Sequence, residues 1–152
     1  MSNSDCGVAK HQAPTKEMPG ELSVAIVSRC AWTLHNFRKS LIDRLSNAGA
    51  RVVALGSELD GFGVRLNAAG VDFQHIPVPL RGLDPMGDLR LFAWLFRLMR
   101  RERPAVVHLF TIKPVIYGTL AAAAAGVPRR VCTITGLGHA FTDGGWAMRH
   151  NA

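Results

Sequence analysis

The segment "VVHLFTIKPVIYG", residues 106–118, changes from one structural pattern to another within a single turn. Its first part, 106–110, is a short apolar run with one histidine, which is typical of a buried β-strand. Lys113 and Pro114 then interrupt the run, and an apolar helical pattern begins at once. Proline is tolerated in the first turn of a helix, because the N–H group that it lacks would have no helical partner there. The five alanines at 121–125 predict a helix that lies close against a sheet.

The same alternation of apolar strands and helices continues along the chain. Phe37, Leu41 and Leu45 recur at helical spacing, and Asp84 with Pro85 is a helix-start signal. The predicted strands are 22–28, 51–57, 71–78, 105–110 and 129–135, and the predicted helices are 34–49, 61–70, 87–103 and 114–127. This pattern predicts an α/β fold: a doubly wound, Rossmann-like parallel sheet in the order 3-2-1-4-5, with helices on both faces.

The composition allows one domain with a real core and sets limits on its partners. The 152 residues are 48% hydrophobic and 19% charged, which is a globular balance. The net charge of +7 favours acidic partners such as phosphates, an anionic membrane surface or nucleic acid. Nothing in the chain resembles an aromatic stacking platform or a recognition helix, so no nucleic-acid partner is predicted.

The cysteines and the chain ends indicate a cytoplasmic location. Cys6, Cys30 and Cys132 are odd in number and widely spaced, which argues against a disulfide framework or a zinc knuckle. Residues 1–20 are polar and lack the apolar core of a signal peptide, so we expect a disordered tail. No apolar run reaches the roughly 18–20 residues of a membrane span.

A binding site is expected where the carboxyl ends of the central strands meet. Three loops should converge there, at 28–36, 110–114 and 135–145. Lys113 would add a full charge to the positive end of a helix and bind an anion, or it is a solvated surface lysine. Gly136 and Gly138 would let a backbone approach a phosphate or a sugar, or they simply form a turn.

The histidines suggest a candidate for acid–base catalysis, and the first turn excludes one class of cofactor site. His139 lies in the glycine loop and is the acid–base candidate, whereas His108 lies within a predicted strand and is expected to support the core. The first turn, at 28–36, has no glycine, which excludes a nicotinamide-dinucleotide fingerprint. No Walker A motif exists, and no histidine–carboxylate cluster has metal-ligand spacing, so no metal site is predicted.

The helix predicted at 87–103 has two interpretations. Arg90, Arg97 and Arg101 fall on one face, and most of the rest is apolar. The helix either covers the sheet with a solvated arginine stripe, or docks on an anionic membrane with Trp94 at the polar–apolar border.

Two long segments resemble the N-terminal, acceptor-side domain of family 4 glycosyltransferases of the GT-B fold. They are "WTLHNFRKSLIDRLSNAGARVVALGS" and "LDPMGDLRLFAWLFRLMRRERPAVVHLFTIKPVIYGTLAAAAAGVPRRVCTITGLGHAFT", within a match over about 22–143. The subgroup resembled builds bacterial surface polysaccharides by transferring a sugar from a nucleotide sugar to a lipid-linked glycan acceptor. The resemblance implies two facing domains, with the donor bound mainly by the C-terminal one and no metal or other cofactor needed.

By this resemblance, several residues would line the cleft. His139 would be catalytic, and the substrate-binding residues would be Lys113, Thr135, Gly136, Gly138 and Asn36. The expected partners are a lipid-linked glycan acceptor, an anionic membrane surface and a separate donor-binding domain. The expected location is cytoplasmic, peripheral on the inner face of the membrane.

The donor half that the resemblance implies is expected to be missing. The pair of glutamates separated by seven residues, which that half uses, does not occur here. The expected division is a tail at 1–20, an incomplete Rossmann-like domain at 21–145 and the start of a further segment at 146–152. Two interpretations remain: half of a glycosyltransferase that is inactive alone, or a non-catalytic subunit that binds acceptor and membrane and recruits a donor-binding domain.

Overall fold

A computed structural model describes residues 22–58, 61–78, 80 and 84–135, so the tail expected at 1–20 and the segment 146–152 lie outside the described residues. Five parallel strands form one sheet in the order β3-β2-β1-β4-β5, which confirms the predicted order and fold class. The strands are β1 (Ser23–Cys30), β2 (Arg51–Ser57), β3 (Asp72–His75), β4 (Val106–Phe110) and β5 (Arg129–Thr133). The helices are α1 (Ala31–Phe37), α2 (Lys39–Asn47), α3 (Phe62–Ala68), α4 (Pro85–Glu102) and α5 (Ile112–Ala124).

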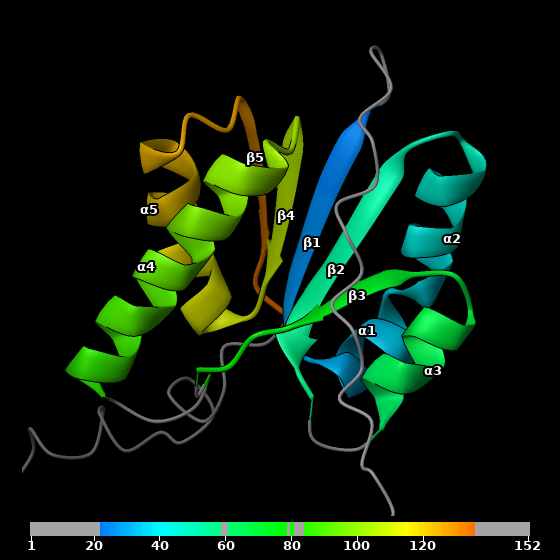
Figure 1. Ribbon diagram of the computed structural model, residues 1–152, viewed down its shortest axis with the longest axis horizontal. Coiled ribbons are helices and arrows are strands. Elements are labelled where there is room, and N and C mark those ends of the chain that lie inside the picture. The colour runs from blue at the N-terminus through cyan, green and yellow to red at the C-terminus, as the bar shows by residue number, and fades with distance from the viewer. Residues whose placement is uncertain (1–21, 59–60, 79, 81–83, 136–152) are drawn as a thin grey trace, which may run out of the picture.

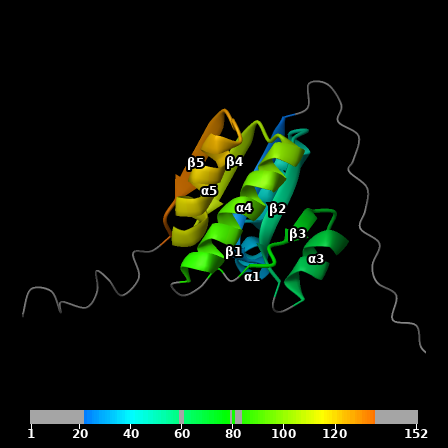
Figure 2. The ribbon, with the colours of Figure 1, turned by 60° about the vertical axis from the view of Figure 1, so that its left-hand side comes forward.

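The helices form two layers on opposite faces of the sheet. Figure 1 shows α1, α2 and α3 on one side and α4 and α5 on the other, and Figure 2 shows α4 and α5 side by side. The chain moves outward from β1 through β2 to β3, then returns past β1 to β4 and continues to β5. Because crossovers between parallel strands are right-handed, reversing the direction of travel puts the later helices on the other face. The reversal lies between β1 and β4.

Each face of the sheet has its own apolar core. Successive side chains of a strand point to opposite faces, so Val24 and Ile26 of β1 lie in one core and Ala25 and Val27 in the other. Against α4 and α5, the sheet packs on a cluster that includes Leu91, Leu95, Met99, Ala121 and Ala122. Against α1, α2 and α3, the cluster includes Leu34, Ile42, Leu66 and Phe110. β1 is therefore buried from both sides over most of its length.

The first helical region differs from the expectation of one helix over 34–49. The chain enters α1 directly after Cys30, and a break at Arg38 separates α1 from α2. Arg38 departs from helical geometry at φ −123° and ψ −6°, and its guanidinium lies 4.2 Å from the centre of the Phe110 ring. The break thus places a cation against an aromatic ring of β4, a contact between distant parts of the chain that helical periodicity alone does not reveal.

In α5, only part of the alanine run packs against the sheet, whereas the sequence predicted close contact for the run as a whole. Ala121 and Ala122 are fully buried, as expected for close helix–sheet contact, but Ala123 and Ala124 are exposed. Gly118 also brings the helix close, because a Cβ built there would lie 2.5 Å from the Leu109 Cδ2 atom. Close packing of α5 on the sheet therefore depends on Gly118, Ala121 and Ala122, which lie on one face of the helix, and not on the alanine run as a whole.

Candidate functional site

The carboxyl ends of β1 and β4, at the lower edge of the sheet in Figure 1, carry a strained residue and two unpartnered polar atoms. Thr111 follows β4 with φ 70° and ψ 160°, a conformation that is nearly confined to glycine. Its backbone N–H donates to the Thr133 carbonyl at 3.3 Å, but its buried hydroxyl has no partner. The His35 Nδ1 atom of α1 is the other buried unpartnered side-chain atom among the described residues. Strain and unsatisfied polar atoms concentrate at functional sites, so this edge is the candidate site.

The turn after β1 is built from hydroxyl groups and not from glycine. The Ser28 and Thr33 hydroxyls are 2.8 Å apart, and Thr33 donates to the Cys30 carbonyl at 2.7 Å. The close approach comes from the neighbouring strand: a Cβ on Gly56 of β2 would lie 3.0 Å from the Cys30 carbonyl carbon. Gly56 was not among the predicted site residues, because a glycine within an apolar strand belongs to no sequence pattern that identifies its neighbour in space.

Lys113 lies in the first turn of α5 and is paired with a carboxylate. Its Nζ atom is 2.5 Å from Asp88 Oδ1, and the Tyr117 hydroxyl donates to Asp88 Oδ2 at 2.8 Å. The Lys113 side chain is only 13% exposed, so it is not the solvated surface lysine of the second interpretation. Its charge is already balanced by Asp88, a partner that no sequence pattern indicated.

Asp88 is the centre of this cluster. The hydrogen bond from Lys113, followed by that from Tyr117, lowers the pKa of the Asp88 carboxyl below its ordinary value of 3.8. The hydrogen bond to Asp88 raises the pKa of the Tyr117 hydroxyl above its ordinary value of 10.0. Asp88 lies in the first turn of α4, where a negative charge also complements the positive end of the helix. The cluster joins the N-terminal turns of α4 and α5 at the carboxyl edge of the sheet.

His108 supports the neighbouring part of the edge. Its Nε2 atom is 2.9 Å from the Thr133 hydroxyl, and its ring stacks on Phe110 with the ring centres 4.1 Å apart. Burial, followed by the charge of Arg38, lowers the pKa of His108 below 6.5. The imidazole is therefore neutral at pH 7 and links β4 to β5.

The other predicted site residues are placed only in part. Asn36 is exposed on α1 and donates its side-chain amide to the Trp32 carbonyl at 2.9 Å. Asn36 lies on α1 and Lys113 on α5, and these two helices cover opposite faces of the sheet. Thr135 is exposed two residues beyond β5. Gly136, Gly138 and His139 lie outside the described residues.

The four residues predicted to dock on a membrane do not share one environment. Arg90 and Arg97 are exposed on α4. Arg101 instead donates to Gln74 at 3.0 Å and forms an ion pair with Glu102, and Trp94 packs partly buried against the core. The sequence analysis missed Met86 and Leu89 on the same helix, which are 60% and 61% exposed.

Metal sites and membrane spans each require a particular arrangement of residues, which can be sought among the described residues. Among these residues, no group of three or more histidine, cysteine or acidic side chains is placed to hold a metal ion. None of the helices there has the length and apolarity needed to cross a bilayer.

Removing the Asp88 carboxylate should destabilise the protein in a pH-dependent way. A carboxyl whose pKa is lowered by folding contributes stability above its unfolded pKa, and this contribution is lost as the pH falls through the folded value. We expect Asp88→Asn to lower the urea midpoint at pH 7, and this deficit to narrow as the pH is lowered from about 5 to about 3. The control is Asp43→Asn, which removes the exposed Lys39–Asp43 pair of α2 and should have little effect. Equal midpoints for the two variants at pH 7 would show that the cluster does not stabilise the fold.

The chain resembles several solved structures in its fold. MurG of Acinetobacter baumannii is 18% identical with a TM-score of 0.55, over 70% of this chain and 32% of the MurG chain. UGT73P12 of Glycyrrhiza uralensis, complexed with glycyrrhetinic acid 3-O-monoglucuronide, is 16% identical with a TM-score of 0.53, over 74% and 28%. The C-terminal domain of the PF1911 hydrogenase from Pyrococcus furiosus is 15% identical with a TM-score of 0.54, over 78% and 95%. At these identities the similarity shows the fold alone.

The sequence itself identifies the family. No curated protein matches the chain. This chain spans about a third of the MurG chain that it resembles. The family model described as "Glycosyl transferase 4-like domain" matches residues 35–151, which include the α1–α2 break, the Asp88–Lys113 cluster and the glycines at 136 and 138. The chain therefore belongs to the glycosyl transferase 4-like domain family.

Proposed function

We propose that this chain is the acceptor-side half of a glycosyltransferase. It would act with a donor-binding domain to transfer a hexose from a nucleotide sugar to a lipid-linked glycan acceptor in polysaccharide biosynthesis, and it would be inactive alone. The observation that carries the proposal is the strained, unsatisfied carboxyl edge in a member of this family. The chain spans 32% of MurG and 28% of UGT73P12, so it is the size of one part of such enzymes.

The proposed acceptor chemistry begins at Lys113. A diphosphate group at the carboxyl edge would compete with Asp88 for the lysine ammonium group, since both are oxyanions. The free N–H groups at the start of α5 favour the same anion. Thr135, Asn36 and the glycine loop at 136–138 would contact the acceptor, and His139 would contact the sugar or transfer a proton.

The membrane proposal rests on exposed residues of the two neighbouring helices. Met86, Leu89, Ile112 and Ile116 are large, apolar and at least half exposed, and all lie in the first two turns of α4 or α5. The Asp88–Lys113 ion pair holds these turns together beside the candidate site. With Arg90 close by on α4, these residues resemble a peripheral membrane surface that would meet a lipid-linked acceptor on the inner, cytoplasmic face.

One observation favours the alternative of a non-catalytic subunit with a separate donor-binding partner. Apolar side chains are exposed on and just beyond the edge strand β5, with Val131 at 44% and Ile134 at 54%. An exposed apolar surface at a strand edge suits a protein partner.

Transfer activity tests the main proposal. We expect the purified chain, incubated with radiolabelled nucleotide sugars and a polyprenyl-diphosphate-linked acceptor, to give no multiple turnover. Adding the donor-binding domain of a family member, fused or separate, should restore transfer. Multiple turnover by the chain alone would overturn the proposed division of labour. Acceptor binding without transfer in every combination would favour the non-catalytic subunit.

The acceptor contact of Lys113 is tested by binding. Lys113→Ala should weaken binding of a diphosphate-bearing acceptor analogue by about ten- to a hundred-fold, since such a contact contributes about 1.5–3 kcal/mol. Asp88→Asn should tighten binding, because it releases the lysine from its carboxylate. The matched control is Lys39→Ala, since Lys39 is paired with Asp43 but lies on α2. Unchanged dissociation constants for both site variants would reduce the cluster to a structural clamp.

Vesicle binding tests the membrane surface. Replacing Arg90 and Arg97 by Gln should weaken binding to anionic vesicles by about thirty-fold, because each basic residue near such a surface contributes on the order of 1 kcal/mol. Replacing Met86 and Leu89 by Gln should reduce the salt-resistant part of binding. The control replaces Arg44 and Arg65 by Gln, because they lie on α2 and α3 and change the net charge equally. If the control variant lowers cosedimentation with the vesicles as much as the Arg90 and Arg97 variant does, the binding is only non-specific charge attraction.

A further inference from the structure

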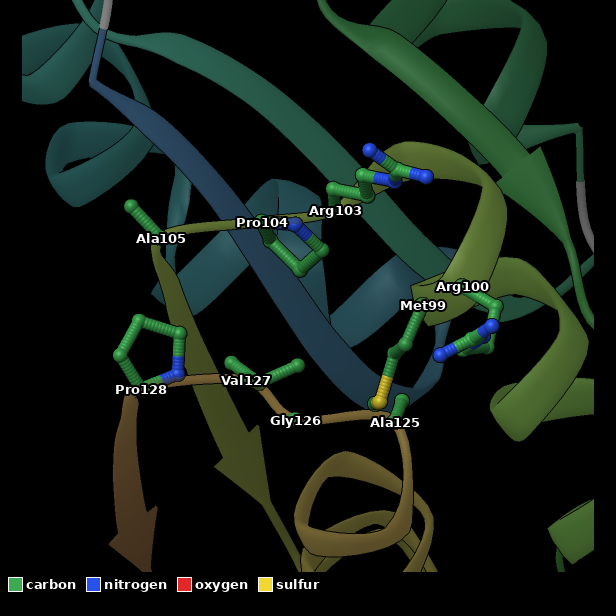
Figure 3. A pocket seen from close by; sticks show the side chains of 9 residues that line it. All are labelled: Met99, Arg100, Arg103, Pro104, Ala105, Ala125, Gly126, Val127 and Pro128. Atoms are coloured by element: carbon green, nitrogen blue, oxygen red, sulfur yellow. The ribbon is translucent and has the colours of Figure 1, made fainter.

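A hollow of about 310 Å³ lies at the amino-terminal edge of the sheet, at the opposite end of the strands from the candidate site. Figure 3 shows the two turns that enclose it, one leading from α4 into β4 and the other from α5 into β5. Its floor is apolar and its rim carries two guanidinium groups. The lining residues are Met99, Arg100, Arg103, Pro104, Ala105, Ala125, Gly126, Val127 and Pro128.

Local sequence explains why the space stays open. Arg103 ends α4 in the left-handed conformation, with φ 44° and ψ 53°, and Pro104 cannot continue a helix. Gly126 ends α5 with φ 78°, and Pro128 follows. Beyond Arg103, the two short turns carry small or rigid residues such as Pro104, Gly126 and Pro128, which leave space between the turns.

Among the described residues, no acid balances the charges around the hollow. Arg100 and Arg103 have no ion-pair partner in the described ranges, and Arg129 and Arg130 follow directly after Pro128. The nearest acid on α4, Glu102, already accepts from Arg51 and Arg101. The ends of α4 and α5 each contribute only about half a negative charge, so several arginines leave a net positive field.

Arg103 adds a second reason to expect a ligand. A non-glycine residue in the left-handed region costs roughly 1–2 kcal/mol, and glycine is the usual residue at such a helix end. An arginine there places a second cation at the rim of the hollow that Arg100 also lines. Figure 3 shows the two guanidinium groups apart, so a shared phosphate would require the two side chains to turn toward it. Helix termination alone does not require this side chain.

We propose that this hollow binds a phosphate monoester attached to a compact apolar group. Two guanidinium forks match the several oxygens and double charge of a phosphate, whereas a carboxylate offers fewer acceptors and a single charge. Met99, Val127 and the neighbouring alanines and prolines cover the apolar part of the ligand. The site is separate from the acceptor edge and does not depend on the proposed transferase function.

Phenyl phosphate is the test ligand, measured by calorimetric titration of the full chain at low salt. We expect it to bind more tightly than inorganic phosphate, which lacks the apolar group, and than benzoate, which lacks the phosphate. Binding should weaken as salt is raised. Backbone amide signals of Ala105, Gly126 and Val127 should shift on titration, since these residues line the hollow.

Two variants separate binding from folding. Replacing Arg100 and Arg103 together by Gln should weaken phenyl phosphate binding at least tenfold. Arg103→Gly should also weaken it while preserving or raising the melting temperature, because glycine relieves the left-handed backbone. The control replaces Arg44 and Arg65 by Gln, which removes the same charge elsewhere and should leave binding unchanged.

Phosphatidic acid vesicles carry the same phosphate monoester on a lipid and form the second arm. The proposal is supported if either ligand binds and the binding is lost when Arg100 and Arg103 are replaced. Binding of phenyl phosphate would indicate a free phosphate monoester as the ligand, and binding of the vesicles would indicate a lipid. Equal affinities for phenyl phosphate and benzoate would overturn the proposal. The proposal would also be overturned if the control variant weakened binding as much as the Arg100 and Arg103 variant does.

Discussion

The rest of the structure depends on β1, a strand that must be buried on both faces and paired on both edges. Residues 24–28 are all buried, with β2 on one side and β4 on the other. A chain that starts at the centre of a sheet has to reverse its direction to fill the second side. That reversal brings the ends of β1 and β4 together and leaves the connections there as the natural place for a ligand.

The Asp88–Lys113–Tyr117 cluster joins the first turns of two helices at the candidate site. α4 and α5 lie side by side because both cover the same face of the sheet, and their first turns share one carboxylate. The carboxylate joins the two helices and balances the lysine charge at the candidate site. An anion bound at this edge, as proposed, would have to compete with Asp88 for the lysine, so its binding and the helix contact would depend on the same charge.

The two ends of the sheet differ in chemistry. The carboxyl edge has a strained threonine, unpartnered polar atoms and a balanced lysine, with exposed apolar side chains next to it. The amino edge instead has a hollow rimmed by arginines for which the described residues supply no acidic partner. The separation follows from the fold, because helix starts gather at one edge of a parallel sheet and helix ends at the other.

The sequence by itself determined the architecture of this protein. Apolar strands such as 22–28 and 105–110, joined by helices of sufficient length, leave few arrangements other than a doubly wound sheet, and family membership rests on local motifs along the chain. The expected location of the site at the carboxyl edge follows from that architecture. These features depend on periodicity and chain direction, which a sequence states directly.

Only the tertiary structure decided which side chains meet. Asp88 and Lys113 lie 25 residues apart, and Arg38 lies far from Phe110, so neither pair has a spacing that a pattern can reveal. Gly56 could be read as a strand residue, but its contact with the turn at Cys30 depends on the register between two strands. Arginines that are equivalent on a helical wheel, such as Arg97 and Arg101, differ because Gln74 and Glu102 reach only the second. A charge therefore becomes free or balanced through neighbours that the sheet order brings together.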